Sequence, residues 1–271
     1  MYNGYKVKAL IFAGRKDTMS ILFSKIKSDI LDEVLIGINT KNKEDIAFID
    51  SYLPKDNKFK KVIIPSDFIG KSDAYYYMFS LLTDEDTIYI KLVDDLIWLS
   101  ENFFESLVKY RIEHPDYYTI YPFIVNNPLC NYLGKYFTEF SNQSDCMFKT
   151  WKEPKYAYFL LRAFAEKNLE INDKIEYAFD DSVAFKRTEI GFPICPSINC
   201  ICFFGKDCKE QKWTEQMKKF GGDEGYITRG IFYDYGRERK NIVYAGCQCV
   251  HYAFYTQRQF LNSKNILKYY R

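Results

Sequence analysis

The sequence lacks an apolar run that could cross a membrane, and it has almost no net charge. A membrane-spanning helix needs about 20 consecutive apolar residues, and no stretch of the 271 residues approaches that length. The 38 Lys and Arg residues nearly balance the 36 Asp and Glu residues, which leaves a net charge of +2. Because nucleic-acid-binding domains are usually strongly basic, we expect neither a membrane protein nor a nucleic-acid-binding protein. The N-terminal segment shows no signal-peptide cleavage site, so we expect a cytoplasmic protein.

Histidine is scarce, and the cysteine spacing is unusual for a metal site. Only His114 and His251 offer an imidazole. Two C-x-C pairs, at residues 200–202 and 247–249, would place their thiols on one face of a strand. Zinc ribbons use a C-x2-C spacing instead. Free buried thiols are therefore expected, and a structural metal site or disulfides are the alternatives.

The N-terminal part of the chain alternates between two hydrophobic patterns. Strand-like segments lie at residues 6–13, 31–40, 60–65 and 87–93, and helix-like segments lie between them at residues 18–27, 43–53 and 72–82. Such alternation predicts a parallel sheet with helices on both faces. In sheets of this kind, ligands bind beyond the carboxyl ends of the strands. Arg15, Asn39, Thr40 and the pair Asp94–Asp95 all fall at such ends.

The remaining residues are patterned less regularly. We expect helices at residues 101–114, 156–167 and 206–220, strands at 117–125 and 197–205, a turn at 126–130, and a glycine turn into a short helix at 221–230. Residues 241–261 predict a strand followed by a last helix. Since no repeat or linker is present, we expect one domain over residues 1–271, with an alternating half (1–100) and a mixed half (101–271).

The stretch TIYIKLVDDLIWLS, at residues 87–100, ends an interior strand in two adjacent carboxylates. A buried carboxylate is costly unless it is paired with a cation, hydrogen-bonded or bound to a metal. We therefore expect Asp94 and Asp95 to meet a positively charged group or a ligand at the edge of the sheet.

Three segments resemble, in this order, motifs of the GT-A-fold glycosyltransferases that use nucleotide sugars, including relatives in large DNA viruses and bacteria. YIKLVDDLIWL resembles their aspartate motif, GGDEGYITRG their acceptor-side acidic motif, and GCQCVHYAFYTQR their C-terminal histidine segment. GRKDTMSILFSKI and LIGINT resemble their nucleotide-binding strand ends. The resemblance covers nearly the whole chain. It implies an α/β, GT-A-like, Rossmann-type fold with a mixed, mostly parallel central sheet flanked by helices, in the host-cell cytoplasm if the chain is viral.

The resemblance also implies a reaction. A hexosyl or pentosyl unit would move from a nucleoside-diphosphate sugar, UDP-linked, to a hydroxyl acceptor such as a glycan. A divalent ion, Mn²⁺ or Mg²⁺, would neutralise the departing diphosphate. Its ligands would be Asp95 and His251, with Asp94. Val93 stands where some members have a further aspartate, so either Asp94 substitutes for it or the metal is held more weakly.

Asp223 and Glu224 are the candidate catalytic carboxylates. In inverting enzymes a carboxylate takes the proton of the attacking hydroxyl. The resemblance assigns this role to Glu224 and gives Asp223 the acceptor hydroxyls. A plain helix-capping pair is the alternative, because acidic groups are stabilised at helix N-termini. For His251 the alternative is a buried, hydrogen-bonded ring.

The remaining candidates concern the sugar nucleotide. Arg15 could meet a phosphate, and Asn39, Thr40 and Lys71 could bind the base or the ribose, although such residues are often ordinary turn or surface residues. Trp98 and Trp213 could stack on sugar rings, with core packing as the alternative.

Three other functions compete with this interpretation. A non-catalytic relative that binds nucleotide sugars or carbohydrates would account for Val93, but Glu224 and His251 argue against it. A metal-dependent phosphohydrolase or nuclease would need more clustered carboxylates. A phage-type DNA-base glycosyltransferase would normally show a basic groove, which the net charge of +2 does not suggest.

Overall fold

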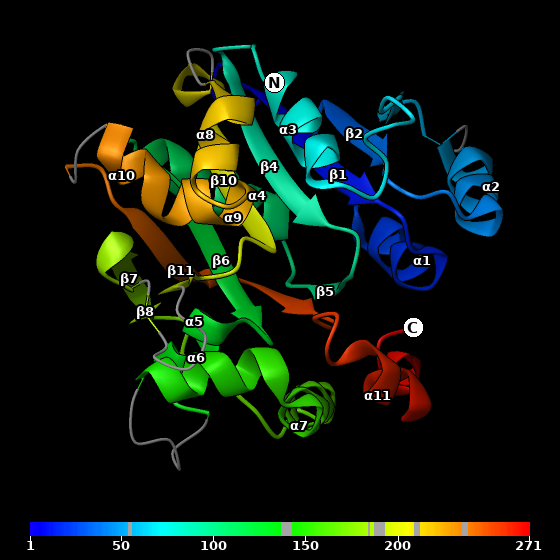
Figure 1. The fold of residues 1–271 in the computed structure, drawn as a ribbon, viewed down its shortest axis with the longest axis vertical. Coiled ribbons are helices and arrows are strands. Elements are labelled where there is room, and N and C mark those ends of the chain that lie inside the picture. The colour runs from blue at the N-terminus through cyan, green and yellow to red at the C-terminus, as the bar shows by residue number, and fades with distance from the viewer. Residues whose placement is uncertain (54–55, 137–142, 184, 187–192, 209–211, 235–237) are drawn as a thin grey trace.

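The computed structural model describes residues 1–53, 56–136, 143–183, 185–186, 193–208, 212–234 and 238–271 (Figure 1). The strands of its main sheet are β1 (Lys6–Ala13), β2 (Glu33–Ile38), β3 (Phe59–Val62), β4 (Thr87–Val93), β5 (Leu96–Leu99), β6 (Ile120–Val125), β7 (Glu176–Phe179), β10 (Cys200–Phe204) and β11 (Asn241–His251). Their order is β3-β2-β1-β4-β10-β6-β11-β5, and β7 pairs with β11. β8 (Phe185–Lys186) and β9 (Pro193–Ile194) form a separate two-stranded sheet.

The strand directions place several chain segments at one edge of the sheet. β1 is parallel to β2 and β4, and β2 is parallel to β3. β10 is antiparallel to both β4 and β6, so β6 runs in the direction of β4, and β11 is parallel to β6. Six strands thus share one direction, while β5, β7 and β10 run the other way. The predicted mixed, mostly parallel sheet is confirmed, and the carboxyl ends of β1, β4 and β11 meet at one edge.

Helices cover both faces of the sheet. They are α1 (Lys16–Lys25), α2 (Lys43–Tyr52), α3 (Ser72–Ser80), α4 (Phe103–Glu113), α5 (Pro128–Leu133), α6 (Gln143–Lys152), α7 (Pro154–Ala165), α8 (Trp213–Lys219), α9 (Asp223–Gly225), α10 (Ile231–Asp234) and α11 (Arg258–Ser263). A π-helical turn, Tyr226–Gly230, joins α9 to α10, and 3-10 turns lie at Asp181–Val183, Gly205–Asp207 and Ile266–Tyr269.

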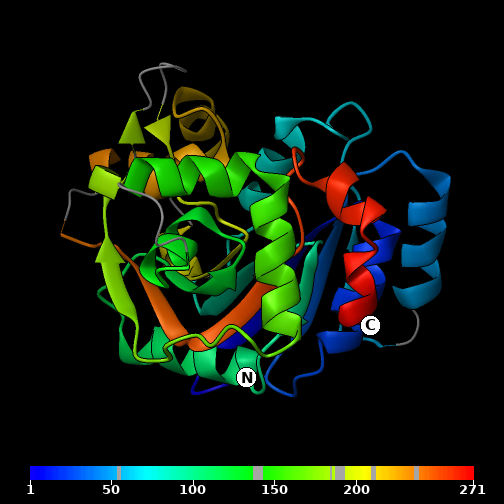
Figure 2. The same cartoon turned by 90° about the horizontal axis from the view of Figure 1, so that it is seen from below.

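Neighbouring residues of β10 show the two layers. The ring centre of Phe203 lies 6.3 Å from that of Phe79 in α3, and the ring centre of Phe79 lies 5.0 Å from that of Trp213 in α8. On the opposite face, the guanidinium of Arg111 in α4 lies 4.5 Å from the ring centre of Phe204. Because successive side chains of a strand point to opposite faces, α3 and α8 cover one face and α4 covers the other (Figure 2).

The turn predicted at residues 126–130 is wrong in its second part, because α5 begins at Pro128. The side-chain oxygen of Asn127 accepts the N–H groups of Leu129 (3.1 Å) and Cys130 (3.3 Å), which caps the helix. Proline fits the first helical position, where its missing N–H costs nothing. The helix predicted over residues 206–220 is shorter, since α8 covers Trp213–Lys219. Residues 209–211 of that prediction lie outside the described residues.

The cysteines with described side chains are all buried and free, namely Cys130, Cys195, Cys200, Cys202, Cys208, Cys247 and Cys249. The prediction of free buried thiols is confirmed for these seven; the side chain of Cys146 is not described. In the described part of the chain, the C-x-C pairs belong to no cluster that could hold a metal. Among the same residues, no helix combines the length and the apolar character that a membrane span requires.

Candidate functional site

Asp94 lies at the carboxyl end of β4, directly beside the carboxyl end of β1. The N–H of Gly14 donates a hydrogen bond of 2.8 Å to one carboxylate oxygen, Oδ2. The guanidinium of Arg15 donates to the other oxygen, Oδ1. The parallel pairing of β1 with β4 brings these groups together across 80 residues of sequence. Both oxygens of Asp94 are therefore engaged by the loop that follows β1.

Asp95 is buried (1% exposed) and lies among three basic side chains. Its Oδ2 accepts a hydrogen bond of 2.7 Å from Arg258 of α11. Its Oδ1 lies 3.3 Å from Arg15 and 3.5 Å from Nε2 of His251. Burial acts to raise the pKa of Asp95, but attraction to Arg15, His251 and Arg258 holds that pKa well below its usual range. Asp95 is therefore an anion at neutral pH, as the cost of burial led us to expect.

A bulge between β5 and β11 sets the position of His251. Val250 pairs with Trp98, but His251 pairs with Leu96, so the register shifts by one residue at this point. Bulges often redirect a side chain next to an active site. The backbone N–H of Tyr252 donates to the carbonyl of Asp95 (2.8 Å), which fastens the end of β11 to the acidic turn.

The ring of His251 is oriented by a backbone carbonyl. Its Nδ1 lies 3.3 Å from the carbonyl oxygen of Asn126. Because a carbonyl can only accept a hydrogen bond, Nδ1 carries a proton, and Nε2 is the ring nitrogen that faces Asp95. Phe254 packs against the same ring, with 4.7 Å between ring centres.

Asp95 and His251 fit a divalent cation. The buried Oδ1 of Asp95 has no hydrogen-bond partner among the described residues, and it lies 3.5 Å from the imidazole nitrogen. Carboxylate oxygens and imidazole nitrogens are typical ligands of Mn²⁺. No third His, Cys, Asp or Glu of the described residues completes a metal cluster with them. The oxygens of Asp94 are bound to Gly14 and Arg15 instead.

Glu224 lies in the short helix α9, after a turn that requires glycine. Gly221 and Gly222 have φ angles of +79° and +122°, which residues with a Cβ rarely adopt. Burial, followed by the charge of Asp223, raises the pKa of Glu224 to about 8, although Lys91 and a hydrogen bond with Ser197 oppose this. A carboxyl group with such a pKa takes up and releases protons near neutral pH, as a general base must.

Lys91 links the two acidic parts of the site. Its side chain is buried (2% exposed) within β4, and its Nζ donates a hydrogen bond of 2.5 Å to the carbonyl of Ile198. Burial lowers the pKa of Lys91, while attraction to Asp223, Glu224 and Asp95 acts in the opposite direction. One buried ammonium group thus interacts with the carboxylates of α9 and with Asp95.

Tyr75 of α3 also connects these groups. Burial and the charge of Asp223 raise the pKa of Tyr75. Arg15 lowers this pKa and Asp95 raises it. The charges of Asp95 and Asp223 therefore both influence the hydroxyl of Tyr75, just as both influence the side chain of Lys91.

The remaining donor-site candidates hold the loops of this edge together. Asn39 accepts the N–H of Gly70 (2.7 Å), and Thr40 accepts the N–H of Asn42 (3.1 Å). Lys71 is exposed immediately before α3. The structure brings Arg15, but not Thr40 or Lys71, into contact with the acidic pair.

The two tryptophans proposed for sugar stacking have packing roles. Trp213 is 4% exposed and lies in the core against Phe79, so the stacking prediction is wrong for this residue. Trp98 is half-buried and contacts the edge of Phe164, with 4.9 Å between ring centres.

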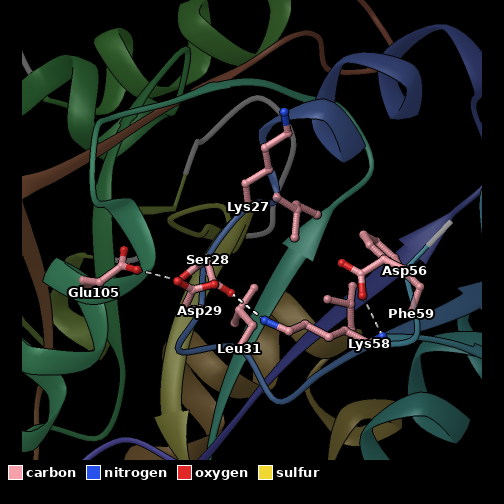
Figure 3. Close-up of a pocket in the computed structure, with 10 residues that line it drawn as sticks. Lys27, Ser28, Asp29, Leu31, Asp56, Lys58, Phe59 and Glu105 are labelled. Carbon is pink, nitrogen blue, oxygen red and sulfur yellow. Dashed lines mark hydrogen bonds between the residues drawn. The ribbon is translucent and has the colours of Figure 1, made fainter.

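Two pockets lie at opposite edges of the sheet. A pocket of about 270 Å³ borders Arg15, Tyr252 and Arg258, beside the acidic pair. Another, of about 370 Å³, lies where the chain enters β2 and β3 (Figure 3). The polar groups of this second pocket already bind one another, since Lys58 donates to the carbonyl of Ser28 (3.0 Å) and the Ser28 hydroxyl donates to Glu105 (2.5 Å). The pocket beside Arg15 and Arg258 is therefore the one that adjoins the candidate site.

No sequence family matches the chain, and no curated protein does. Its fold, in contrast, matches solved structures. The 4-diphosphocytidyl-2C-methyl-D-erythritol synthase of Anaerococcus prevotii superposes with a TM-score of 0.50 and 11% identity, over 97% of this chain and 96% of the other. GalNAc-T7 superposes with a TM-score of 0.51 and 11% identity, over 93% of this chain. The chain has a GT-A-like fold. It spans 44% of the GalNAc-T7 chain, so it corresponds to less than half of that protein.

Sequence reasoning missed several residues of the candidate site, above all Arg258 and Lys91. Arg258 follows His251 by seven residues, but nothing in the local pattern shows that the start of the last helix folds back onto Asp95. Lys91 carried a signal, because a lysine inside an apolar strand must find a partner.

Proposed function

We propose that this protein is a glycosyltransferase that uses a nucleoside-diphosphate sugar, UDP-linked, and transfers a hexosyl or pentosyl unit to a hydroxyl of a glycan. The observation that carries the proposal is the meeting of a buried carboxylate, two arginines and an oriented imidazole at the ligand-binding edge of a GT-A-like sheet. The GalNAc-T7 structure contains UDP, GalNAc and Mn²⁺, which supports this class of donor and cation.

The arginines bind the diphosphate. Arg15 and Arg258 both border the pocket beside the acidic pair, and the Arg15 side chain is 41% exposed. Guanidinium groups match phosphate oxygens in charge and geometry. Asp94 holds Arg15 in position and so acts on the donor indirectly. Asn39, Thr40 and Lys71 bind the base or the ribose of the donor.

Asp95 and His251 would hold Mn²⁺ or Mg²⁺, whose charge would offset the charge that develops on the leaving diphosphate. The carbonyl of Asn126 keeps Nδ1 of His251 protonated, which leaves Nε2 for this role.

Glu224 takes the proton from the acceptor hydroxyl while the hydroxyl oxygen bonds to the anomeric carbon and the bond from that carbon to the diphosphate breaks on the opposite face. This single displacement inverts the configuration at the sugar. Its raised pKa makes it a stronger base than an exposed glutamate. Asp223 binds the other acceptor hydroxyls. Residues 1–100 thus supply Arg15, Asp94 and Asp95, and residues 101–271 supply the base and complete the donor site through His251 and Arg258.

The first experiment is a melting-temperature screen against UDP, GDP and their sugars, with and without Mn²⁺. A ligand that binds the native state raises its stability by mass action. We expect a Mn²⁺-dependent rise with one UDP sugar. The absence of a shift with every nucleotide would contradict the proposal and favour a binding protein without a nucleotide site.

Three variants separate the roles. Asp95→Asn and His251→Ala should abolish the Mn²⁺-dependent part of the shift while the protein remains folded. Glu224→Gln should retain the shift but lower transfer by about 10²–10⁴-fold. Full transfer activity in Glu224→Gln would show that another group is the base.

A further inference from the structure

Tyr255 is an exposed aromatic side chain on a loop with a firmly held backbone. Its side chain is 73% exposed. The loop joins β11 to α11 (Figure 1). The hydroxyl of Thr256 donates to the carbonyl of Trp151 (2.6 Å), and the side chain of Gln257 donates to the carbonyl of Thr150 (2.5 Å). Both bonds fasten the loop to the end of α6, so the exposure of Tyr255 does not come from a loose segment.

Trp151 fixes the tilt of the Tyr255 ring. The two rings meet edge to face, with 5.9 Å between their centres and 70° between their planes. Trp151 in turn contacts Phe148 edge to face (6.2 Å), and the ammonium of Lys152 lies 4.3 Å from its ring centre. Tyr255 is therefore supported from one side, and most of its surface remains open to solvent.

The position of Tyr255 connects it to the proposed donor site. It lies four residues after His251 and three before Arg258 in the sequence. The preceding residue, Phe254, packs on the His251 ring. The α6 side of this loop belongs to the half of the chain that we expect to bind the acceptor.

We propose that Tyr255, supported by Trp151, is a stacking platform for a sugar ring of the acceptor glycan; this rests on the proposed function. The apolar face of a sugar packs on an aromatic ring, while polar groups at the ring's rim bind its hydroxyls. Because the ring is already oriented, little side-chain entropy is lost on binding.

The surroundings favour a sugar over a protein partner. Protein interfaces bury many residues on each side, whereas Tyr255 is the one large hydrophobic residue of the loop 252–257 whose side chain is exposed. A single exposed aromatic ring suits one small amphipathic ring.

The test is saturation-transfer NMR with the methyl glycosides of lactose, cellobiose and maltose, with and without UDP and Mn²⁺. We expect the wild type to transfer saturation to the C–H protons on one face of a sugar ring. Tyr255→Ala should weaken this binding about tenfold, and Tyr255→Phe should preserve it. The matched control is Tyr233→Ala, because Tyr233 is 69% exposed but precedes β11 in the chain, whereas Tyr255 follows it.

Three results would overturn the platform: no saturation transfer to any of the glycosides, equal binding by the wild type and Tyr255→Ala, or a loss of UDP affinity in Tyr255→Ala. The last result would mean that the ring stacks on the nucleobase. If the wild type does not bind UDP at all, the proposed function is wrong instead. The NMR experiment without nucleotide then still tests whether Tyr255 binds the sugar.

Discussion

At the scale of single residues, the site depends on how each charge is paired inside the protein. Asp95 stays ionised because Arg15, His251 and Arg258 surround it, whereas Glu224 lies near a second carboxylate and has a raised pKa. The pKa values of two acidic groups of one site are thereby shifted in opposite directions. Such a separation is typical of sites in which one carboxylate binds a cation and the other exchanges protons.

Lys91→Met should shift the pH dependence of sugar transfer to the acceptor. The ammonium of Lys91 lowers the pKa of Glu224, so its removal should raise that pKa above about 8. If Glu224 acts as an anion, the rising limb of the pH–rate profile moves to higher pH. The measurement is the initial rate between pH 5 and pH 10, with Lys8→Met as the control, because Lys8 binds Asp84 and Glu33 away from the site. If the rising limb of the pH–rate profile stays at the same pH in Lys91→Met, the ionisation of Glu224 does not determine that limb.

Glu224→Gln should stabilise the protein at high pH. The pKa of Glu224 is raised from 4.5 to about 8 on folding, so its contribution to stability is fully present below pH 4.5 and is lost as the pH rises through 8. Glutamine does not titrate. The melting temperature of the variant should therefore match the wild type near pH 4.5 and exceed it above pH 8. Glu101→Gln, at an exposed position, should show no such trend; a constant difference at all pH values would contradict the burial of this carboxyl group.

Val93 shows what the sequence could and could not predict at this scale. Its place before Asp94 and Asp95 marked a departure from the aspartate motif, and the structure packs Val93 against the core. The sequence could not show that Arg15 and Arg258 both reach the acidic pair, because these contacts join positions 79 and 163 residues apart. Long-range pairing of exposed side-chain types leaves no periodic signal.

At the scale of elements, the alternating half of the chain was predictable and the mixed half was predictable in part, since the helix predicted at residues 101–114 and the strand predicted at 117–125 correspond to α4 and β6. The strand predicted at residues 6–13 is β1 itself, and the expected second and third strands lie within a few residues of β2 and β3. Buried strands and amphipathic helices leave strong hydrophobic periodicity. α6 went unpredicted because residues 131–177 combine aromatic and charged residues without a clear period, and with it the support of Tyr255 was missed.

Asn127→Ala should destabilise the protein by about 2–3 kcal/mol. Asn127 caps α5, and its amide donates to the carbonyl of Ser197 (2.8 Å) and to Asn199 (3.0 Å). Ser197 hydrogen-bonds Glu224, so the same variant should also lower transfer. The measurement is urea unfolding, and the matched control is Asn42→Ala at the exposed cap of α2, for which we expect about 1 kcal/mol or less. Equal losses in the two variants would show that the buried amide contributes nothing beyond the cap.

At the scale of the whole molecule, the site joins distant parts of the chain across one sheet. Arg15 follows β1, Asp94 and Asp95 follow β4, His251 ends β11, and Arg258 begins α11. A ligand that binds all of them must stabilise the sheet as a unit, since β1 pairs with β4, and β10 and β6 connect β4 to β11.

Hydrogen exchange should show this unit directly. Binding of UDP with Mn²⁺ should slow amide exchange in residues 87–95 and 241–258 together, because both segments hold the ligand groups. Residues 26–34, which line the pocket at the opposite edge (Figure 3), should keep their rates. Protection confined to residues 87–95 would indicate that β11 and α11 take no part in donor binding.

The hydrogen bond from Arg258 to Asp95 also has a consequence for synthesis of the chain. Ribosomes make Asp95 more than 160 positions before its second cation, since the two partners are 163 residues apart. A nascent or truncated chain that ends before residue 251 has neither the imidazole nor the second guanidinium, and it would leave this carboxylate with Arg15 alone. Competence for donor binding therefore arises only late in translation, so prematurely terminated products should be inert towards the cell's sugar nucleotides instead of competing for them.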